Sequence, residues 1–303
     1  MRLVTRSDFD GLVCGVLLKE VEQIDEVIFA HPKDMQDGTV TITQNDIITN
    51  LPYHPNCGMW FDHHASEGER IDLDMNFRGM FTVAPSAARV VFNYYNSPKH
   101  QKYEDLLVEV DKSDAATLSM QDVINPNGWI LLSYVMDPRT GLGKNHSFRI
   151  SNRDLMMQMI DLIHSRSVEE ILELPDVKER VAVYFKDEME FEAIMKKTSK
   201  VDGNVIVTDL RNEAELPTGN RFKIYAMYPE ANVQLRIHYG KDKNTVVCAL
   251  GHSIFNRTSK THVGTLMAKY GGGGHKGAGT CQLKAADAER QIKEIIDACK
   301  KDG

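Results

Sequence analysis

The sequence is poor in cysteine, in long apolar runs and in basic charge, and each shortage excludes a class of protein. Its five cysteines among 303 residues are scattered, odd in number and never in C-x-x-C spacing. That pattern is untypical of a disulfide framework and predicts reduced thiols in the cytoplasm. Charged side chains interrupt the first ten residues, and no stretch approaches the ~20 apolar residues of a membrane helix. We therefore expect neither a signal peptide nor contact with a membrane.

The net charge of −7 argues against binding of long nucleic acid, which needs many contacts between basic side chains and phosphates. The charge is unevenly distributed along the chain. Residues 201–303 contain 15 Lys and Arg against 11 Asp and Glu, a balance of +4, which leaves −11 to residues 1–200. This distribution is compatible with a small phosphate-containing anion as the partner, and not with long duplex nucleic acid.

Short apolar segments alternate with amphipathic ones in the first half of the chain. Residues 27–30, 47–49 and 59–61 predict strands, while the apolar residues of 13–24 and 87–94 fall on one helical face. This alternation predicts an α/β fold with a mainly parallel sheet flanked by helices. Functional sites in such sheets lie beyond the carboxyl ends of the strands.

The sequence changes character near residue 200. Residues 152–200 are rich in Met, Glu and Lys and predict helices, whereas apolar and polar residues alternate over 233–239 as in a half-buried strand. We expect a catalytic domain over residues 1–180 and a helical linker over residues 181–200. A smaller α/β domain is expected to follow over residues 201–303.

Three clusters of residues carry the chemistry. They are Asp8-Phe9-Asp10-Gly11, Asp62-His63-His64, and Gly271–Gly274 followed by His275. The first two clusters offer carboxylates and imidazoles, which are ligands for divalent metals. The third offers backbone amides that no side chain shields, which suits an anion. A metal site and an anion site in one chain indicate phosphate-ester chemistry.

In this combination the chain resembles the DHH/DHHA1 phosphoesterases. The resemblance rests on Ser-Asp-Phe-Asp-Gly at 7–11, Asp-His-His at 62–64 and Gly-Gly-Gly-Gly-His-Lys-Gly-Ala-Gly at 271–279. It covers essentially the whole chain. It implies an N-terminal DHH domain that binds metal and performs catalysis, and a C-terminal DHHA1 domain that binds the substrate.

The resemblance implies a site for Mn²⁺, or another divalent metal, with one or two ions. By this resemblance Asp8, Asp10 and His63 are metal ligands, His64 lies beside the substrate phosphate, and Asp62 supports both histidines. Asp62, His63 and His64 are accordingly the predicted catalytic residues. A divalent cation lowers the pKa of water and neutralises charge on phosphoryl oxygens.

A further aspartate ligand is expected in the segment Val108-Glu109-Val110-Asp111-Lys112-Ser113-Asp114. Asp114 fits better because it ends the segment. Asp111 is the second candidate, and we expect one of the two, more readily Asp111, to have only a structural role.

Two positions depart from the pattern of many family members. Val4 stands where a His is common, and Asn50 stands where an Asp is common. Asn50 remains a candidate ligand, although its neutral amide oxygen is weaker than a carboxylate. Asp46 and His31 are possible replacements, but Asp46 lies four residues too early and a His before Pro is more often a surface residue. We therefore expect one tight metal ion and a second that is weak or assembled with the substrate.

The resemblance also assigns a substrate-binding set to the C-terminal domain. Its members are Ser253, Asn256, Arg257, Gly272, Gly273, Gly274 and His275, with His64 from the first domain. Arg257 would bind a phosphate through two parallel hydrogen bonds. A flexible linker is the alternative for the glycine run, but an amphipathic segment precedes it and a predicted strand follows.

The predicted function is a metal-dependent phosphoesterase that hydrolyses phosphodiester bonds of short oligonucleotides or dinucleotides between the two domains. Two alternatives remain open from the sequence. One is a different phosphate substrate, as in an exopolyphosphatase or a 3′-phosphoadenylate phosphatase. The other is a nucleotide-binding regulatory protein with weak catalysis, and the sequence is compatible with a homodimer.

Overall fold

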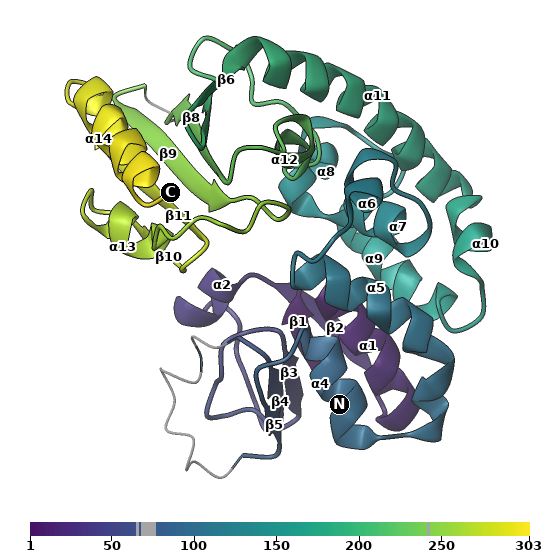
Figure 1. Cartoon of the computed structure of the whole chain (residues 1–303). Coiled ribbons are helices and arrows are strands. Elements are labelled where there is room, and N and C mark those ends of the chain that lie inside the picture. Colours follow the sequence, from purple (N-terminus) through teal and green to yellow (C-terminus); the bar gives the residue numbers. More distant parts are fainter. Residues whose placement is uncertain (65–66, 68–76, 241–242) are drawn as a thin grey trace. The chain divides into compact units, whose positions relative to one another are not determined.

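The chain folds into two compact units. The computed structural model describes residues 1–64, 67, 77–240 and 243–303 (Figure 1). The N-terminal unit comprises Met1–Leu118 and Pro126–Tyr184, and the C-terminal unit comprises Ser119–Asn125 and Phe185–Gly303. The boundary at residues 184 and 185 falls inside the long helix α11 (Pro175–Thr198). In the described part of the chain, no helix combines the length and the apolar composition needed to span a membrane.

The N-terminal unit contains a sheet of five parallel strands in the order β2-β1-β3-β4-β5. The strands are β1 (Arg2–Arg6), β2 (Glu26–Ala30), β3 (Asp46–Thr49), β4 (Met59–Asp62) and β5 (Gly79–Phe81). Every residue of β3 and β4 is buried, as expected for parallel strands covered on both faces. The strand order reverses between β1 and β3, and ligands of open α/β sheets bind beyond the carboxyl ends of the strands at such a point.

Helices cover one face of this sheet. Helix α1 (Phe9–Val21) packs on β1 and on α4 (Ala87–Tyr95), which also contacts β4 and β5. Helices α5 (Glu104–Asp114) and α9 (Asn152–Leu162) pack against the outer side of α1. Further helical elements of this unit are η1 (Pro98–Tyr103), α7 (Gly128–Met136), η2 (Pro138–Thr140), α8 (Leu142–Asn145) and α10 (Val168–Leu172).

An aromatic cluster fills the opposite face of the sheet. Trp60 of β4 is fully buried there, stacks on Phe81 with ring centroids 5.5 Å apart, and meets Tyr53 edge-on at 5.3 Å. Its indole Nε1 donates to the carbonyl oxygen of Leu51 at 2.9 Å. The short helix α2 (Pro32–Gln36) contributes Met35 to the same core. This face is therefore closed mainly by side chains from connecting segments.

The C-terminal unit is built on a mixed sheet of six strands in the order β10-β11-β9-β8-β7-β6. The strands are β6 (Ser199–Asp202), β7 (Val205–Asp209), β8 (Val233–Tyr239), β9 (Thr245–His252), β10 (Gly273–Gly274) and β11 (Ala278–Lys284). Only β7 and β8 pair in parallel among these strands. The predicted alternation over 233–239 is observed, because Val233, Leu235 and Ile237 are buried and their neighbours are not.

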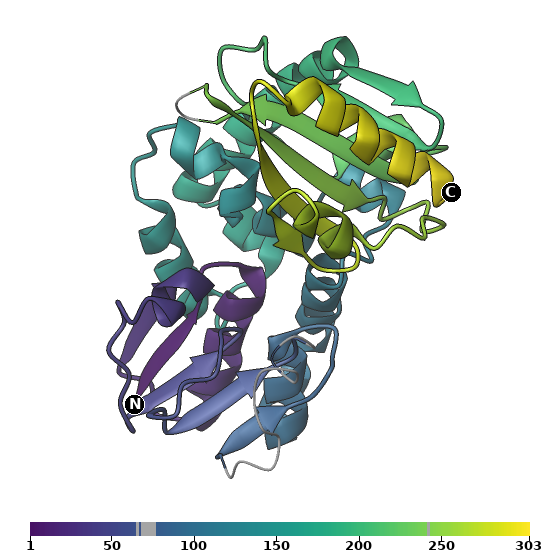
Figure 2. The same ribbon diagram turned by 90° about the vertical axis from the view of Figure 1, so that its left-hand side faces the viewer.

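Each face of the second sheet carries its own core. Helix α14 (Ala288–Lys301) lies across one face and, with α13 (Val263–Ala268), packs on Val205, Leu235 and Leu250 (Figure 2). On the other face, Phe191 and Met195 of α11 pack with Ile206 and with α12 (Lys223–Met227). The α6 helix (Met120–Ile124) contacts α12 in the same unit.

The α/β class is confirmed, with a parallel sheet first and a smaller mixed sheet second. The proposed domain limits of 1–180, 181–200 and 201–303 stay a prediction. The compact units meet inside α11, and residues 119–125 join the C-terminal unit although the residues on either side of them belong to the N-terminal unit.

We predict that Trp60→Ala lowers the free energy of unfolding by about 3–5 kcal/mol, because it empties a fully buried aromatic site. The measurement is urea unfolding followed by far-ultraviolet circular dichroism. Val108→Ala, on a side chain that is 44% exposed, is the control and should change stability by no more than ~0.5 kcal/mol. A loss below about 1 kcal/mol for Trp60→Ala would contradict this account of the core.

Candidate active site

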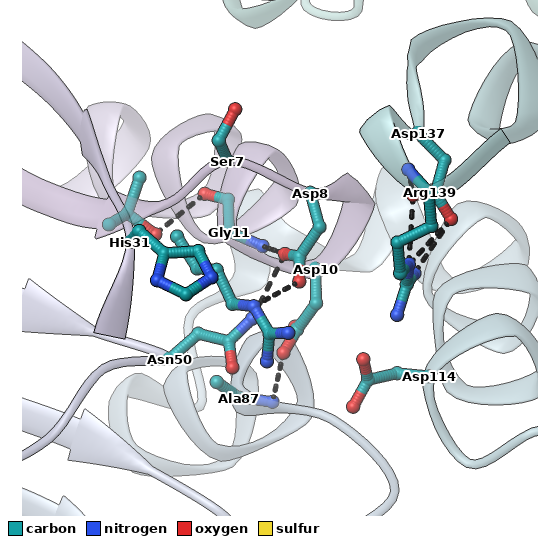
Figure 3. A network of polar contacts seen from close by, with 12 residues as sticks. Ser7, Asp8, Asp10, Gly11, His31, Asn50, Ala87, Asp114, Asp137 and Arg139 are labelled. Atoms are coloured by element: carbon teal, nitrogen blue, oxygen red, sulfur yellow. Dashed lines mark hydrogen bonds and ion pairs between the residues drawn. The ribbon is translucent and has the colours of Figure 1, made fainter. Parts of the chain in front are cut away.

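The turn from β1 into α1 positions Asp8. Asp8 is the N-cap of α1, and its Oδ1 accepts a hydrogen bond from the amide of Gly11 at 3.0 Å (Figure 3). A Cβ atom on Gly11 would lie 2.1 Å from the carbonyl oxygen of Arg6, so only glycine fits this turn. The Asp-x-Asp-Gly sequence therefore forms a helix cap that presents a carboxylate beyond the end of β1.

Asp10 is fixed by a second helix. Its two carboxylate oxygens accept hydrogen bonds from the amides of Ala87 and Ala88, at 2.9 and 2.7 Å. These amides belong to the first turn of α4, whose N-terminus favours negative charge. Asp10 is almost fully buried, and each of its oxygens keeps a second lone pair for another partner.

His63 follows β4 and completes a group of metal-binding side chains. Its Nδ1 lies 3.0 Å from the carbonyl oxygen of Ala84 and donates to it, because a carbonyl can only accept. In the neutral ring, that bond leaves the Nε2 lone pair for a metal. Nε2 lies 3.1 Å from Asp114 Oδ2 and 3.8 Å from Asp10 Oδ2. We call this group the Asp10–His63–Asp114 cluster, since its ligand atoms all lie within 4.8 Å of one another.

His64 points its Nδ1 at the carboxylate of Asp62. The distance between Nδ1 and Oδ1 is 2.9 Å, and the second oxygen of the buried Asp62, Oδ2, has no hydrogen-bond partner among the described residues. This contact holds the His64 ring and fixes which nitrogen carries the proton. Asp62, His63 and His64 form a second group of side chains with metal-binding spacing.

The electrostatics of the cluster favour a bound positive charge. Burial raises the pKa of Asp10 well above its usual value, and the charge of Asp114 adds to that effect. Burial opposes protonation of His63, but the Asp114 and Asp10 carboxylates outweigh it and raise the pKa of His63 to about 9. Burial also raises the pKa of Asp8, against the opposing charge of Arg6. A divalent cation would reverse these directions, because it favours carboxylates and a neutral imidazole.

Asn50 lies at the carboxyl end of β3 and faces Asp8. Its Nδ2 donates to Asp8 Oδ1 at 3.0 Å, while its buried Oδ1 has no hydrogen-bond partner in the described part of the chain. Its φ of 54° is a left-handed conformation that Asn tolerates better than most residues. Buried polar atoms are normally paired, so Asn50 Oδ1 and Asp62 Oδ2 are oxygens available to a cation or to water. The donor set as a whole fits a divalent metal.

Asp111, the weaker of the two aspartate candidates, lies outside the cluster. Its Oδ1 accepts from Ser86 Oγ at 2.6 Å, and its Oδ2 accepts from Nε and Nη2 of Arg89 at 2.9 and 2.6 Å. The ion pair ties α5 to the start of α4. The structure thus brings Asp114, one turn later on α5, to His63 and gives Asp111 a structural contact.

Asp46 and Val4 offer the cluster no free ligand atom, and His31 uses its Nδ1 in a helix cap. Asp46 begins β3, at the opposite end from Asn50, and pairs with Arg2 at 2.7 Å. His31 caps α2 by accepting the amide hydrogen of Lys33 on its Nδ1. Val4 is fully buried in the aromatic core. It places an apolar side chain at the position where a His is common. Asp46 thus does not restore a missing ligand, and a ligand role for His31 stays a prediction.

The glycine run of the C-terminal unit forms a tight edge hairpin. Gly273 and Gly274 pair with Thr280 and Gly279, and a Cβ on Gly272 would lie 2.0 Å from the carbonyl oxygen of Thr280. The amides of Gly271, Gly272 and His275 already donate to protein carbonyls. The glycines therefore allow close backbone packing, and fewer free amides remain than the sequence pattern suggested.

The loop after β9 lies beside this hairpin, since the amide of His252 donates to the carbonyl oxygen of Gly277 at 2.8 Å. Ser253 is buried, and its Oγ accepts the amide hydrogens of Phe255 and Asn256. Arg257 is exposed, and its Nε donates to the carbonyl oxygen of Ile254 at 3.0 Å. The predicted substrate-binding residues of the C-terminal unit are thus neighbours within one unit.

Two arginines near Asp8 were not found from the sequence. Arg6 Nε lies 3.0 Å from Asp8 Oδ2, and the charge of Arg139 also acts on Asp8 and Asp114. Arg6 belongs to β1 immediately before the motif, so its position was readable. Arg139 comes from η2, distant in sequence, and only the Asp-x-Arg spacing of Asp137 and Arg139 gave a local sign of a turn.

Comparison with known proteins places this site in a family. No family model and no curated protein sequence matches the chain. A solved structure of a pGpG-specific phosphodiesterase, PggH from Vibrio cholerae, is 48% identical with a TM-score of 0.89, over 100% of this chain and 99% of that one. The chain belongs to the DHH/DHHA1 phosphoesterase family.

Two more distant structures share the fold alone. The DHH domain of a protein described as a member of the s1p family of ribosomal proteins is 14% identical with a TM-score of 0.50, over 99% of this chain and 86% of that one. RecJ from Thermus thermophilus, solved in complex with Mn²⁺, has the same identity and TM-score, over 99% of this chain and 52% of that one. The DHH/DHHA1 resemblance read from the motifs is thus confirmed.

We predict that Asp114→Asn and Asp111→Asn separate metal binding from stability. Asp114→Asn should weaken the binding of Mn²⁺, used as a probe, at least ~100-fold in calorimetric titration, because it removes a charged ligand. Asp111→Asn should leave that affinity within about threefold and lower the free energy of unfolding by about 1–3 kcal/mol, because charge-assisted bonds to Arg89 weaken. The reverse pattern would make Asp111 the ligand.

Proposed function

We propose that this DHH/DHHA1 protein hydrolyses the phosphodiester bond of short linear dinucleotides, with pGpG as the preferred substrate. The observation that carries the proposal is the 48% identity, over nearly the whole of both chains, to a pGpG-specific phosphodiesterase. The Asp10–His63–Asp114 cluster supports it, because the ligands needed for metal-assisted hydrolysis are together in the N-terminal unit.

Mn²⁺ is the proposed metal, and we propose one tightly bound ion. Asp10, His63 and Asp114 would hold it, with Asp8 and the free oxygen of Asn50 as further ligands. When bound, a divalent cation supplies an acidified water and neutralises negative charge on the phosphate. Val4 offers no ligand atom and Asn50 offers no charge, which weakens any second site on the Asp8 side.

The protein groups around the cluster orient the reacting atoms. The carbonyl of Ala84 holds the His63 ring with Nε2 toward Asp10 and Asp114. Asp62 holds Nδ1 of His64, which leaves Nε2 of His64 as an acceptor in the neutral ring. In the protonated ring Nε2 can donate a hydrogen bond to a phosphate oxygen or to the leaving oxygen. The first turn of α4 keeps Asp10 in place through two backbone amides.

In the C-terminal unit, we propose that Arg257 and His275 contact the end of the dinucleotide. Both side chains are exposed, and the backbone around each is fixed by hydrogen bonds inside the unit. Ser253 and Asn256 would shape the loop, since their polar atoms already bind backbone groups or Thr258. A cytoplasmic location and a homodimer stay predictions.

We predict that the purified protein with Mn²⁺ cleaves pGpG with a kcat/KM at least ~100-fold above that for polyphosphate or adenosine 3′,5′-bisphosphate, as expected where polar contacts to a correct substrate discriminate. Product formation is followed by chromatography. His63→Ala should lower the rate at least ~1000-fold by removing a metal ligand, while circular dichroism stays unchanged. Turnover of polyphosphate without turnover of pGpG would refute the proposal, and pGpG binding without hydrolysis would favour the regulatory alternative.

A further inference from the structure

A second arginine stands beside the acidic cluster without pairing to it. Arg139 lies in η2, which follows α7 in the N-terminal unit. Figure 3 shows its side chain extending from η2 with the guanidinium end directed toward Asp114. Its charge acts on Asp8 and Asp114, yet its ion pair within 4.0 Å is with Asp137.

Asp137 holds the Arg139 side chain in one orientation. Nε of Arg139 lies 2.8 Å from both carboxylate oxygens of Asp137, and Nη2 lies 2.8 Å from Oδ2. The backbone amide of Arg139 donates to the same carboxylate at 2.8 Å. This contact uses one edge of the planar guanidinium. Within the described residues, Nη1 keeps its two hydrogens for a further partner, and the side chain is 38% exposed.

A fixed cation at this position does not serve to hold a metal. Positive charge close to a divalent cation repels it and weakens its binding. Arg6 already neutralises Asp8, from 3.0 Å. The charges would be balanced if an anion bound between Arg139 and a metal ion held by the cluster, since both cations attract an anion.

Phosphate is the anion that fits this arrangement. A guanidinium offers parallel N–H donors that match two phosphoryl oxygens, and charge-assisted bonds of this kind strengthen as negative charge develops in the transition state. We propose that Arg139 is a substrate-binding residue of the N-terminal unit, and that it contacts the non-bridging oxygens of the phosphate being cleaved. This inference rests on the proposed phosphodiesterase function.

A purely structural role for the Asp137–Arg139 pair predicts a different behaviour. The pair spans two residues of one turn and is partly exposed, and such pairs contribute little to stability. Arg149 offers a matched control in the same unit, because it also pairs through Nε with an aspartate, Asp176, at 2.7 Å. The acidic cluster distinguishes the two arginines, since the charge of Arg149 acts on Asp176 and Glu179 instead.

The test compares Arg139→Ala, Arg139→Lys and Arg149→Ala with the wild-type protein. Arg139→Ala should lower kcat for pGpG by about 10²–10³-fold, as when a transition-state donor is removed. Its Mn²⁺ affinity, measured by calorimetry without substrate, should stay equal or become tighter because a repulsive charge is lost. Arg139→Lys should recover part of the rate, and Arg149→Ala should stay within twofold of wild type.

Two results would overturn the inference. One is an Arg139→Ala variant whose kcat stays within threefold of wild type. The other is an Arg139→Ala variant whose Mn²⁺ affinity falls tenfold, because that result would mean that Arg139 supports the metal ligands.

If the wild-type protein binds pGpG but does not cleave it, the proposed function fails separately from this inference. The affinity for pGpG then tests the role of Arg139. An affinity at least tenfold weaker in Arg139→Ala supports the inference, and an unchanged affinity overturns it. Absence of pGpG binding by the wild type overturns both.

Discussion

The two hydrogen bonds that Asp10 accepts from the first turn of α4 are the contact on which the N-terminal site depends. They tie the helix that follows β1 to the helix that follows β5, so the two elements cannot shift independently. Because α1 also packs on α5, the same arrangement carries Asp114, the last residue of α5, toward His63. A carboxylate at a helix N-terminus stays ionised more easily than one in an apolar core. The fold thus holds a buried acid in place and directs it toward His63.

Charge balance explains the rest of the site. Asp8, Asp10, Asp62 and Asp114 gather in one buried region, and desolvation of such carboxylates is costly unless cations or hydrogen-bond donors face them. The protein supplies donors from Gly11, from α4 and from Asn50, and one close guanidinium from Arg6. Asn50 Oδ1 and Asp62 Oδ2 still lack a hydrogen-bond partner in the part of the chain that the structure describes. The remaining negative charge is therefore available to a divalent metal, which the ligand types favour.

The structural features that depend on neighbouring residues could be predicted from local sequence patterns. Strand positions, the parallel sheet and the delivery of Asp8, Asn50 and His63 to one edge follow from apolar segments that each end in a polar residue. The preference for Asp114 over Asp111 was also readable, although its reason, the Arg89 ion pair, required the packing of α5 on α4. Long-range features were not readable. Arg139 reaches the cluster from a distant turn. The glycine run donates the amides of Gly271 and Gly272 to carbonyls of α13, and the amide of His275 to its own hairpin. Neither fact has a signature in nearby sequence.

The proposal of one tight metal ion rests on a comparison of the ligands around Asp10 with those around Asp8. Asp10, His63 and Asp114 are all present, and their ligand atoms lie within 4.8 Å of one another. On the Asp8 side, Val4 faces the aromatic core and Asn50 has replaced a charge with an amide that donates to Asp8. The Arg6 guanidinium lies where it compensates Asp8 directly. A second divalent ion there would have to displace this ion pair, and like-charge repulsion from Arg6 would oppose it. These contacts support the proposal of one tightly bound metal ion with arginines beside it.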